Sequence, residues 1–183
     1  MDVNVELQMT ALSLYHSTQQ GDWKEALTTF KKNPGIHEIA TNSSGDTLLH
    51  VALNDYKDDR AGEIVDEIKK NPSWSSALGK ENDRGDTPLH CAASIGSLKM
   101  CVAIAEAHCG DNKLSEARNQ KGETPLFLAA LHGHKDAFLY LHHFRCPDQS
   151  SRLWQRRDGE SPSLHHSSRT LSLGISNHSS VQR

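Results

Sequence analysis

The chain has 183 residues, of which 36% are hydrophobic and 23% are charged, and its formal net charge is -3. This balance predicts a soluble globular protein with a buried core, and it argues against a dedicated nucleic-acid binder, which is typically strongly basic. No stretch approaches the roughly 18 apolar residues that span a bilayer, and the first residues do not resemble a secretory signal. We therefore expect a cytoplasmic chain with reduced cysteines and no direct membrane insertion.

The first 40 residues predict a divergent helical unit that caps one end of the protein. Its first helix is expected to begin near Leu14 and to end near Gly21, and its second helix runs from Trp23 to Phe30. This unit lacks the short sequence that is repeated in the rest of the chain, so we expect residues 1–40 to be a separate capping unit.

One phrase recurs four times, starting at Gly45, Gly85, Gly122 and Gly159, with spacings of 40, 37 and 37 residues. It reads Gly-Asp-Thr-Leu-Leu-His, Gly-Asp-Thr-Pro-Leu-His, Gly-Glu-Thr-Pro-Leu-Phe and Gly-Glu-Ser-Pro. Self-similarity at such a period is typical of a repeat protein, in which each unit packs only on its neighbours. Repeats are expected over residues 41–158.

The residues of the phrase make physical sense as a turn that leads into a short helix. Gly85 can adopt the positive φ of a tight turn, Thr87 is a good N-cap, and Pro88 suits the first helical position. Gly96 and Gly133 stand where a helix ends in the left-handed conformation. The corresponding residues of the neighbouring units are Thr47, Gly122, Thr124 and Pro125. Apolar residues three and four positions apart predict a second helix from Leu98 to Ala105 and another from Ala137 to Phe144.

The sequence Thr87-Pro88-Leu89-His90-Cys91-Ala92 resembles the signature of the ankyrin repeat, whose period is about 33 residues. The resemblance implies an all-α ankyrin-repeat solenoid of turn–helix–helix units. It also implies that His50 and His90 are structural, each connecting its own turn to the backbone of the next repeat, whereas Phe127 replaces this histidine in the third unit. The longer period predicts extra loop residues near residues 58–60 and 110–112.

A finer resemblance comes from the N-terminal unit. Leu14-Tyr15 together with Gly21-Asp22-Trp23-Lys24-Glu25-Ala26 is similar to the opening of a plant family of ankyrin-repeat membrane proteins, which carry a C-terminal membrane region called the PGG domain. Asn33-Pro34 and Asn71-Pro72 also fit that family. The resemblance implies a role in plant signalling or defence, with full-length relatives at the plasma membrane.

The repeat pattern fails after Pro162. The following residues are rich in serine and histidine, and such a composition predicts disorder, so we expect residues 159–183 to be an incomplete repeat with a disordered tail. An alternative hypothesis is that a shift of reading frame replaced a fourth repeat and a membrane region. The chain would then be a truncated product with impaired function.

The histidines and cysteines raise the hypothesis of a metal site. His132, His134, His142, His143 and Cys146 form the densest cluster, but their spacing is not that of a zinc finger. Cys91 and Cys101 are expected to fill the core. No phosphate-binding or nucleophile motif is present, so we expect no enzyme activity, no cofactor and no metal; a His/Cys metal-binding protein is the remaining alternative.

The resemblance places binding on a concave side made of the turns and the exposed side of the first helices. The positions that correspond to this side are Asp83, Arg84, Asp86, Ser94, Ile95, Gln120, Lys121, Glu123, Leu131 and His132, with Ser43, Ser44, Asp46, Asn54 and Asp55 in the preceding unit. Charged, polar and apolar residues are mixed there. This composition suits another protein as the partner better than a nucleic acid.

Overall fold

The computed structural model describes residues 3–33, 35–107 and 113–145. These residues form α-helices and short 3-10 helices, in the order α1 (Val3–Gln19), α2 (Trp23–Lys32), η1 (Ile36–Glu38), α3 (Leu48–Asn54), α4 (Asp58–Lys70), η2 (Pro72–Gly79), α5 (Pro88–Ser94), α6 (Leu98–Ala107), α7 (Lys113–Glu116), α8 (Pro125–Leu131) and α9 (Lys135–Arg145). No strand occurs in this part of the chain.

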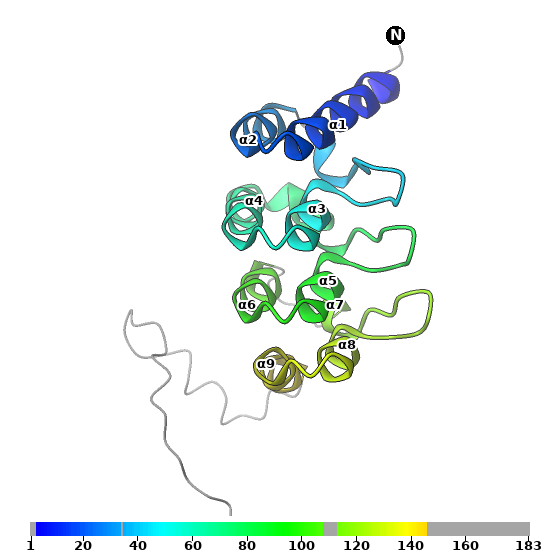
Figure 1. Ribbon diagram of the computed structural model, residues 1–183, viewed down its shortest axis with the longest axis vertical. Coiled ribbons are helices and arrows are strands. Elements are labelled where there is room, and N and C mark those ends of the chain that lie inside the picture. Colours follow the sequence, from blue (N-terminus) through cyan, green and yellow to red (C-terminus); the bar gives the residue numbers. More distant parts are fainter. Residues whose placement is uncertain (1–2, 34, 108–112, 146–183) are drawn as a thin grey trace, which may run out of the picture. The chain divides into compact units, whose positions relative to one another are not determined.

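The helices form antiparallel pairs that stack in two layers (Figure 1). In one layer α3 contacts α5 and α5 contacts α8; in the other, α2, α4, α6 and α9 follow one another. The pair α1–α2 lies at the N-terminal end of the stack. An extended loop precedes each of α3, α5 and α8 and projects to the same side. The predicted all-α solenoid of turn–helix–helix units is therefore confirmed over the described residues.

We call the layer of α3, α5 and α8 the inner layer and the layer of α2, α4, α6 and α9 the outer layer. The inner helices are short because residues at both of their ends specify where they start and stop. Thr47, Thr87 and Thr124 are the N-cap residues of α3, α5 and α8, and proline occupies the first helical position of α5 and α8. Gly96 and Gly133 follow the last residues with φ of 73° and 74°. The predicted caps and left-handed helix ends are thus present.

The core lies between the two layers. Leu89, Ala92 and Ala93 of α5 are wholly buried, as are Ile104 and Cys101 of α6. Alanines at these positions let α5 pack closely against both α3 and α8, since a larger side chain would push these neighbouring helices apart. The expectation that Cys91 and Cys101 fill the core is confirmed.

Two sequence predictions about element boundaries are wrong. The first helix begins at Val3 and not near Leu14, because Ala11 is buried and Leu7 packs against the core. Residues 58–60 are the first turn of α4 rather than an inserted loop, and Asp58 and Asp59 favour a helix start there through the helix dipole. The longer first period comes instead from α4 itself, with 13 residues against 10 in α6.

Several expectations fall on residues that the structure does not describe. They are the inserted loop at 110–112, the fourth phrase at Gly159 and the disordered tail at 159–183. Among the helices that it does describe, none is both long and apolar enough to cross a bilayer.

One residue is unfavourable for its backbone conformation. Tyr56 follows α3 at the position that Gly96 and Gly133 occupy after α5 and α8, and its φ is 56°. The surrounding bonds are the same in kind: Tyr56 N–H donates to Leu53 O at 2.9 Å and Gly96 N–H to Ala93 O at 3.2 Å. The Tyr56 side chain is 74% exposed, so packing does not compensate for the strain.

We therefore expect Tyr56→Gly to raise the free energy of unfolding by about 1 kcal/mol, because glycine alone adopts this conformation without a steric penalty. Chemical denaturation monitored by circular dichroism measures the change. Tyr56→Ala, which retains a Cβ, should give little of this gain. Gly96→Ala should destabilise, since its φ is positive and the added Cβ would overlap the His134 ring. A Tyr56→Gly protein no more stable than the parent would contradict the assignment of strain.

Candidate partner-binding face

The loops before α3, α5 and α8 end in three tips, which we define as residues 42–46, 82–86 and 119–123. Each tip is organised by an asparagine. Asn82 Oδ1 accepts hydrogen bonds from the backbone N–H groups of Arg84 and Asp86, both at 3.0 Å. Asn42 and Asn119 do the same in their own tips. Two orphan backbone donors are thereby satisfied in each turn, so each tip has a defined backbone conformation.

Neighbouring tips are hydrogen-bonded to each other. Asn82 Nδ2 donates to Asp46 Oδ1 at 2.8 Å, and Asn119 Nδ2 donates to Asp86 Oδ1 at 2.9 Å. Backbone bonds run in parallel, from Asp83 N–H to Ser44 O at 3.1 Å and from Gln120 N–H to Arg84 O at 3.0 Å. The three tips therefore form one continuous hydrogen-bonded ridge.

His50 and His90 connect each inner helix to the following tip. His50 Nδ1 accepts from Thr47 N–H at 3.2 Å, and His50 Nε2 lies 2.9 Å from Asp86 O. His90 repeats the arrangement with Thr87 N–H at 3.1 Å and Glu123 O at 3.1 Å. These are the hydrogen bonds that the family resemblance implies for the two histidines.

The geometry fixes the tautomer of both rings. A backbone N–H can only donate, so Nδ1 is the acceptor, and the ring proton resides on Nε2, from which it is donated to the carbonyl oxygen. Burial lowers the pKa of His50 and of His90, although the hydrogen bonds to Asp86 O and Glu123 O oppose the shift. Both rings are therefore neutral structural groups.

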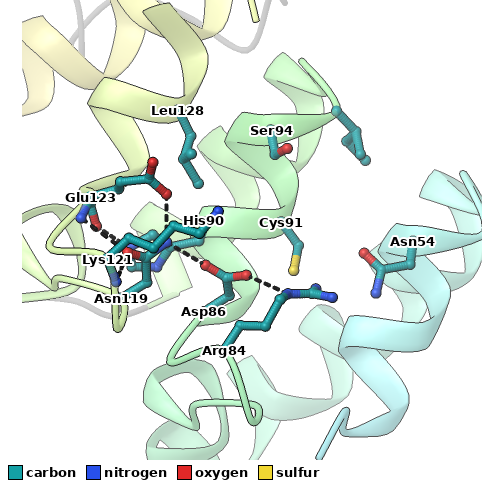
Figure 2. A pocket seen from close by; sticks show the side chains of 11 residues that line it. Asn54, Arg84, Asp86, His90, Cys91, Ser94, Asn119, Lys121, Glu123 and Leu128 are labelled. Carbon is teal, nitrogen blue, oxygen red and sulfur yellow. Dashed lines mark hydrogen bonds and ion pairs between the residues drawn. The ribbon is translucent and has the colours of Figure 1, made fainter. Parts of the chain in front are cut away.

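A hollow of about 220 Å³ opens beside the second and third tips and the inner helices α5 and α8 (Figure 2). Six of the ten residues predicted to bind a partner line it: Arg84, Asp86, Ser94, Ile95, Lys121 and Glu123. Asn54, which was predicted for the same side in the preceding unit, also lines the hollow, and the structure adds His90, Cys91, Asn119 and Leu128. These eleven residues are the lining of the hollow.

The other four predicted residues lie outside the hollow but are exposed. Asp83 and Gln120 are on the tips, where Gln120 Nε2 donates to Asp83 O at 2.7 Å. Leu131, which is 59% exposed, and His132 lie at the C-terminal end of α8.

Asp46 was expected to face solvent as a tip residue, but it is buried. It is 6% exposed, and its carboxylate accepts hydrogen bonds from Asn42 and Asn82. The prediction that Asp46 lies on the binding surface is wrong, because its charge is needed to satisfy the amide of the next tip. Ser43, Ser44, Asn54 and Asp55 are exposed as expected.

The hypothetical metal cluster does not assemble among the described residues, where no three histidine, cysteine or acidic side chains come together in a way that could hold an ion. His134 Nε2 instead lies 2.9 Å from Ser94 O, and Cys146 is outside the described residues. Burial raises the pKa of the Cys91 and Cys101 thiols to about 12, so both are protonated and poor ligands.

The three asparagines that organise the tips are functional residues that were not predicted from the sequence. The signal was available, since Asn42, Asn82 and Asn119 each stand three residues before a glycine of the repeated phrase. Asparagine is a common turn residue because its side chain bonds to the backbone two residues onward. The regular spacing therefore predicts the intra-tip bonds, whereas the bonds between tips depend on the stacking distance.

A family model and two solved structures relate the chain to known proteins. A family model of ankyrin repeats, in three copies, matches residues 56–150. A chain in the crystal structure of the yeast ribosomal protein Rps3 in complex with its chaperone Yar1 has a similar fold, with a TM-score of 0.58, 19% identity and coverage of 73% of this chain and 91% of that one. The structure of EF0377, an ankyrin-repeat protein, gives a TM-score of 0.57 and 19% identity, with coverage of 74% and 62%. No curated protein matches the chain.

The two buried histidines predict a loss of stability in mild acid. Because the pKa of His50 and His90 is lower in the folded than in the unfolded chain, their stabilising contribution is present above about pH 6.5 and is lost as the pH falls below it. Ring-proton NMR titrations should give midpoints below about pH 6.5 for both residues. In His90→Gln the decrease in melting temperature between about pH 7 and pH 5 should be smaller than in the parent protein. A midpoint above 6.5 for either ring would refute the neutral assignment.

Proposed function

The chain belongs to the ankyrin-repeat family, and we propose that it binds another protein through the ridge of tips and the exposed side of α5 and α8. The observation that carries this proposal is the hollow, which collects six of the ten residues that correspond to the binding side of the family. The proposed contact residues are Asp83, Arg84, Asp86, Ser94, Ile95, Gln120, Lys121, Glu123, Leu131 and His132.

Preorganisation supports the proposal. The tips are held by asparagine side chains, by hydrogen bonds from one tip to the next and by two buried histidines. A surface that is already ordered loses little conformational entropy on binding, so more of the contact energy appears as affinity.

The chemistry of the surface supports a protein partner. Arg84 and Lys121 are exposed cations, and Ile95 and Leu131 offer apolar contact on the same side of the stack. Protein interfaces combine such apolar contacts with arginine, whereas a nucleic-acid site needs a strongly basic surface. One of the similar structures is itself a ribosomal protein in complex with its chaperone.

We infer that this surface acts without catalysis. The ankyrin fold is in general a non-catalytic interaction module. His50 and His90 hold backbone groups of their own repeats, and the two described cysteines are buried as neutral thiols. None of these groups is available as a nucleophile or as a base.

We further propose that the chain is related to the plant ankyrin-repeat proteins that carry a PGG domain, and that it works in plant signalling or defence from the cytoplasm. The support is the sequence of the N-terminal unit, from Leu14-Tyr15 to Gly21-Asp22-Trp23. Sequencing the gene beyond the codon for Arg183 tests this relation. The expected result is a downstream region, in any frame, that encodes further repeats and apolar membrane segments; a gene without one would refute it.

Introducing a charge on the apolar part of the surface should abolish partner binding. We expect Ile95→Arg and Leu131→Arg each to lower proximity labelling of the partner about tenfold or more, because a buried unpaired charge at an interface is costly. Leu139→Arg is the matched control, since Leu139 is 43% exposed but lies on α9 in the outer layer. Melting curves establish that all three variants fold. Labelling unchanged in both Ile95→Arg and Leu131→Arg would exclude this side of the stack as the interface.

A further inference from the structure

The carboxylates that line the hollow already accept hydrogen bonds from other residues of the protein. Asp86 Oδ1 accepts from Asn119 Nδ2 at 2.9 Å, and Asp86 Oδ2 accepts from Arg84 Nε at 2.9 Å. Glu123 Oε2 accepts from Asn119 Nδ2 at 3.0 Å. These carboxylates therefore hold the tips, and three of their four oxygens already accept a hydrogen bond within the protein.

The cationic groups of the hollow keep free donors. The side chain of Arg84 is 60% exposed and uses only Nε for Asp86, which leaves the edge formed by Nη1 and Nη2 without an acceptor among the described residues. Lys121 is exposed, and its Nζ also contacts no acceptor in this part of the chain. Figure 2 shows the Arg84 guanidinium directed into the hollow, toward Asn54 and Cys91. The hollow is therefore rich in unused donors.

One wall of the hollow is apolar. Ile95 is half-buried, and Leu128 and Cys91, which also line the hollow, are almost wholly buried. With a volume of about 220 Å³ the hollow is smaller than the roughly 300–1,000 Å³ of sites for drug-sized ligands. It has room for one or two side chains of a peptide segment.

Resting on the proposed function, we propose that the hollow receives an aspartate or glutamate of the partner protein together with an adjoining apolar side chain. The carboxylate accepts two parallel hydrogen bonds from the Nη1–Nη2 edge of Arg84, a geometry that suits arginine, and Lys121 adds a second positive charge to the lining of the hollow. The apolar neighbour packs against Ile95 and Leu128. A basic segment would meet two like charges and carboxylates that are already bonded.

Selection from a random-peptide phage library tests this assignment on the full chain. Three baits are used: the parent protein, the double variant Arg84→Gln/Lys121→Gln, and the control Lys24→Gln/Lys32→Gln, which makes the same change of net charge on α2, in the other layer. The parent and the control should enrich peptides in which an acidic residue adjoins a large apolar one. A synthetic copy of an enriched peptide should bind the Arg84/Lys121 variant about tenfold or more weakly in fluorescence anisotropy, because charged hydrogen bonds are lost.

Binding of that peptide to Ile95→Arg separates the two proposals. Suppose that binding of the peptide is lost in Ile95→Arg. If the enriched peptides then lack acidic residues, or if the peptide binds the Arg84/Lys121 variant as tightly as the parent, the acidic-segment inference is overturned while the proposed interface stands. If neither Ile95→Arg nor the double variant affects binding, the peptides bind elsewhere and both proposals fail. A selection that enriches no sequence also overturns the inference. Melting curves of each variant exclude unfolding as the cause of a lost signal.

Discussion

The hydrogen bond from a buried asparagine amide to the acidic residue of the preceding tip is the interaction on which the binding surface depends. Asn82 and Asn119 use Oδ1 to hold their own turn and Nδ2 to reach Asp46 or Asp86. One side chain therefore determines both the conformation of a tip and its position relative to its neighbour. Since each bond pairs an amide with a buried or half-buried carboxylate, removing either partner would leave a polar group without its hydrogen bond.

This arrangement divides the residues of a tip into two classes. The carboxylate of Asp86 accepts one hydrogen bond from Asn119 and one from Arg84, whereas the remaining donors of Arg84 and the ammonium of Lys121 have no acceptor among the described residues. The acid is thus used by the fold, and the cations are available to a partner. A tip that is electrically balanced in the sequence is consequently unbalanced in the hydrogen bonds it can offer.

The parts of the fold that sequence could predict are those with local causes. Gly96 and Gly133 end their helices and Thr87 caps α5 because backbone conformation and capping are determined within a few residues. The start of α1 at Val3 could not be read from its own sequence, since it depends on the burial of Ala11 against other elements. Asp46 was assigned to the surface for a similar reason: its partner Asn82 is 36 residues away, and only stacking brings the two together.

The third repeat lacks one of the connections that the first two share. Phe127 stands where His50 and His90 do, and it has no ring nitrogen with which to cap its own turn or to reach a carbonyl beyond it. Thr124 still caps α8, through a bond from Phe127 N–H to its Oγ1 at 3.3 Å. The ring is 50% exposed, and Leu131 on the same helix is 59% exposed. The inner layer therefore changes from polar connections at α3 and α5 to exposed apolar side chains at α8.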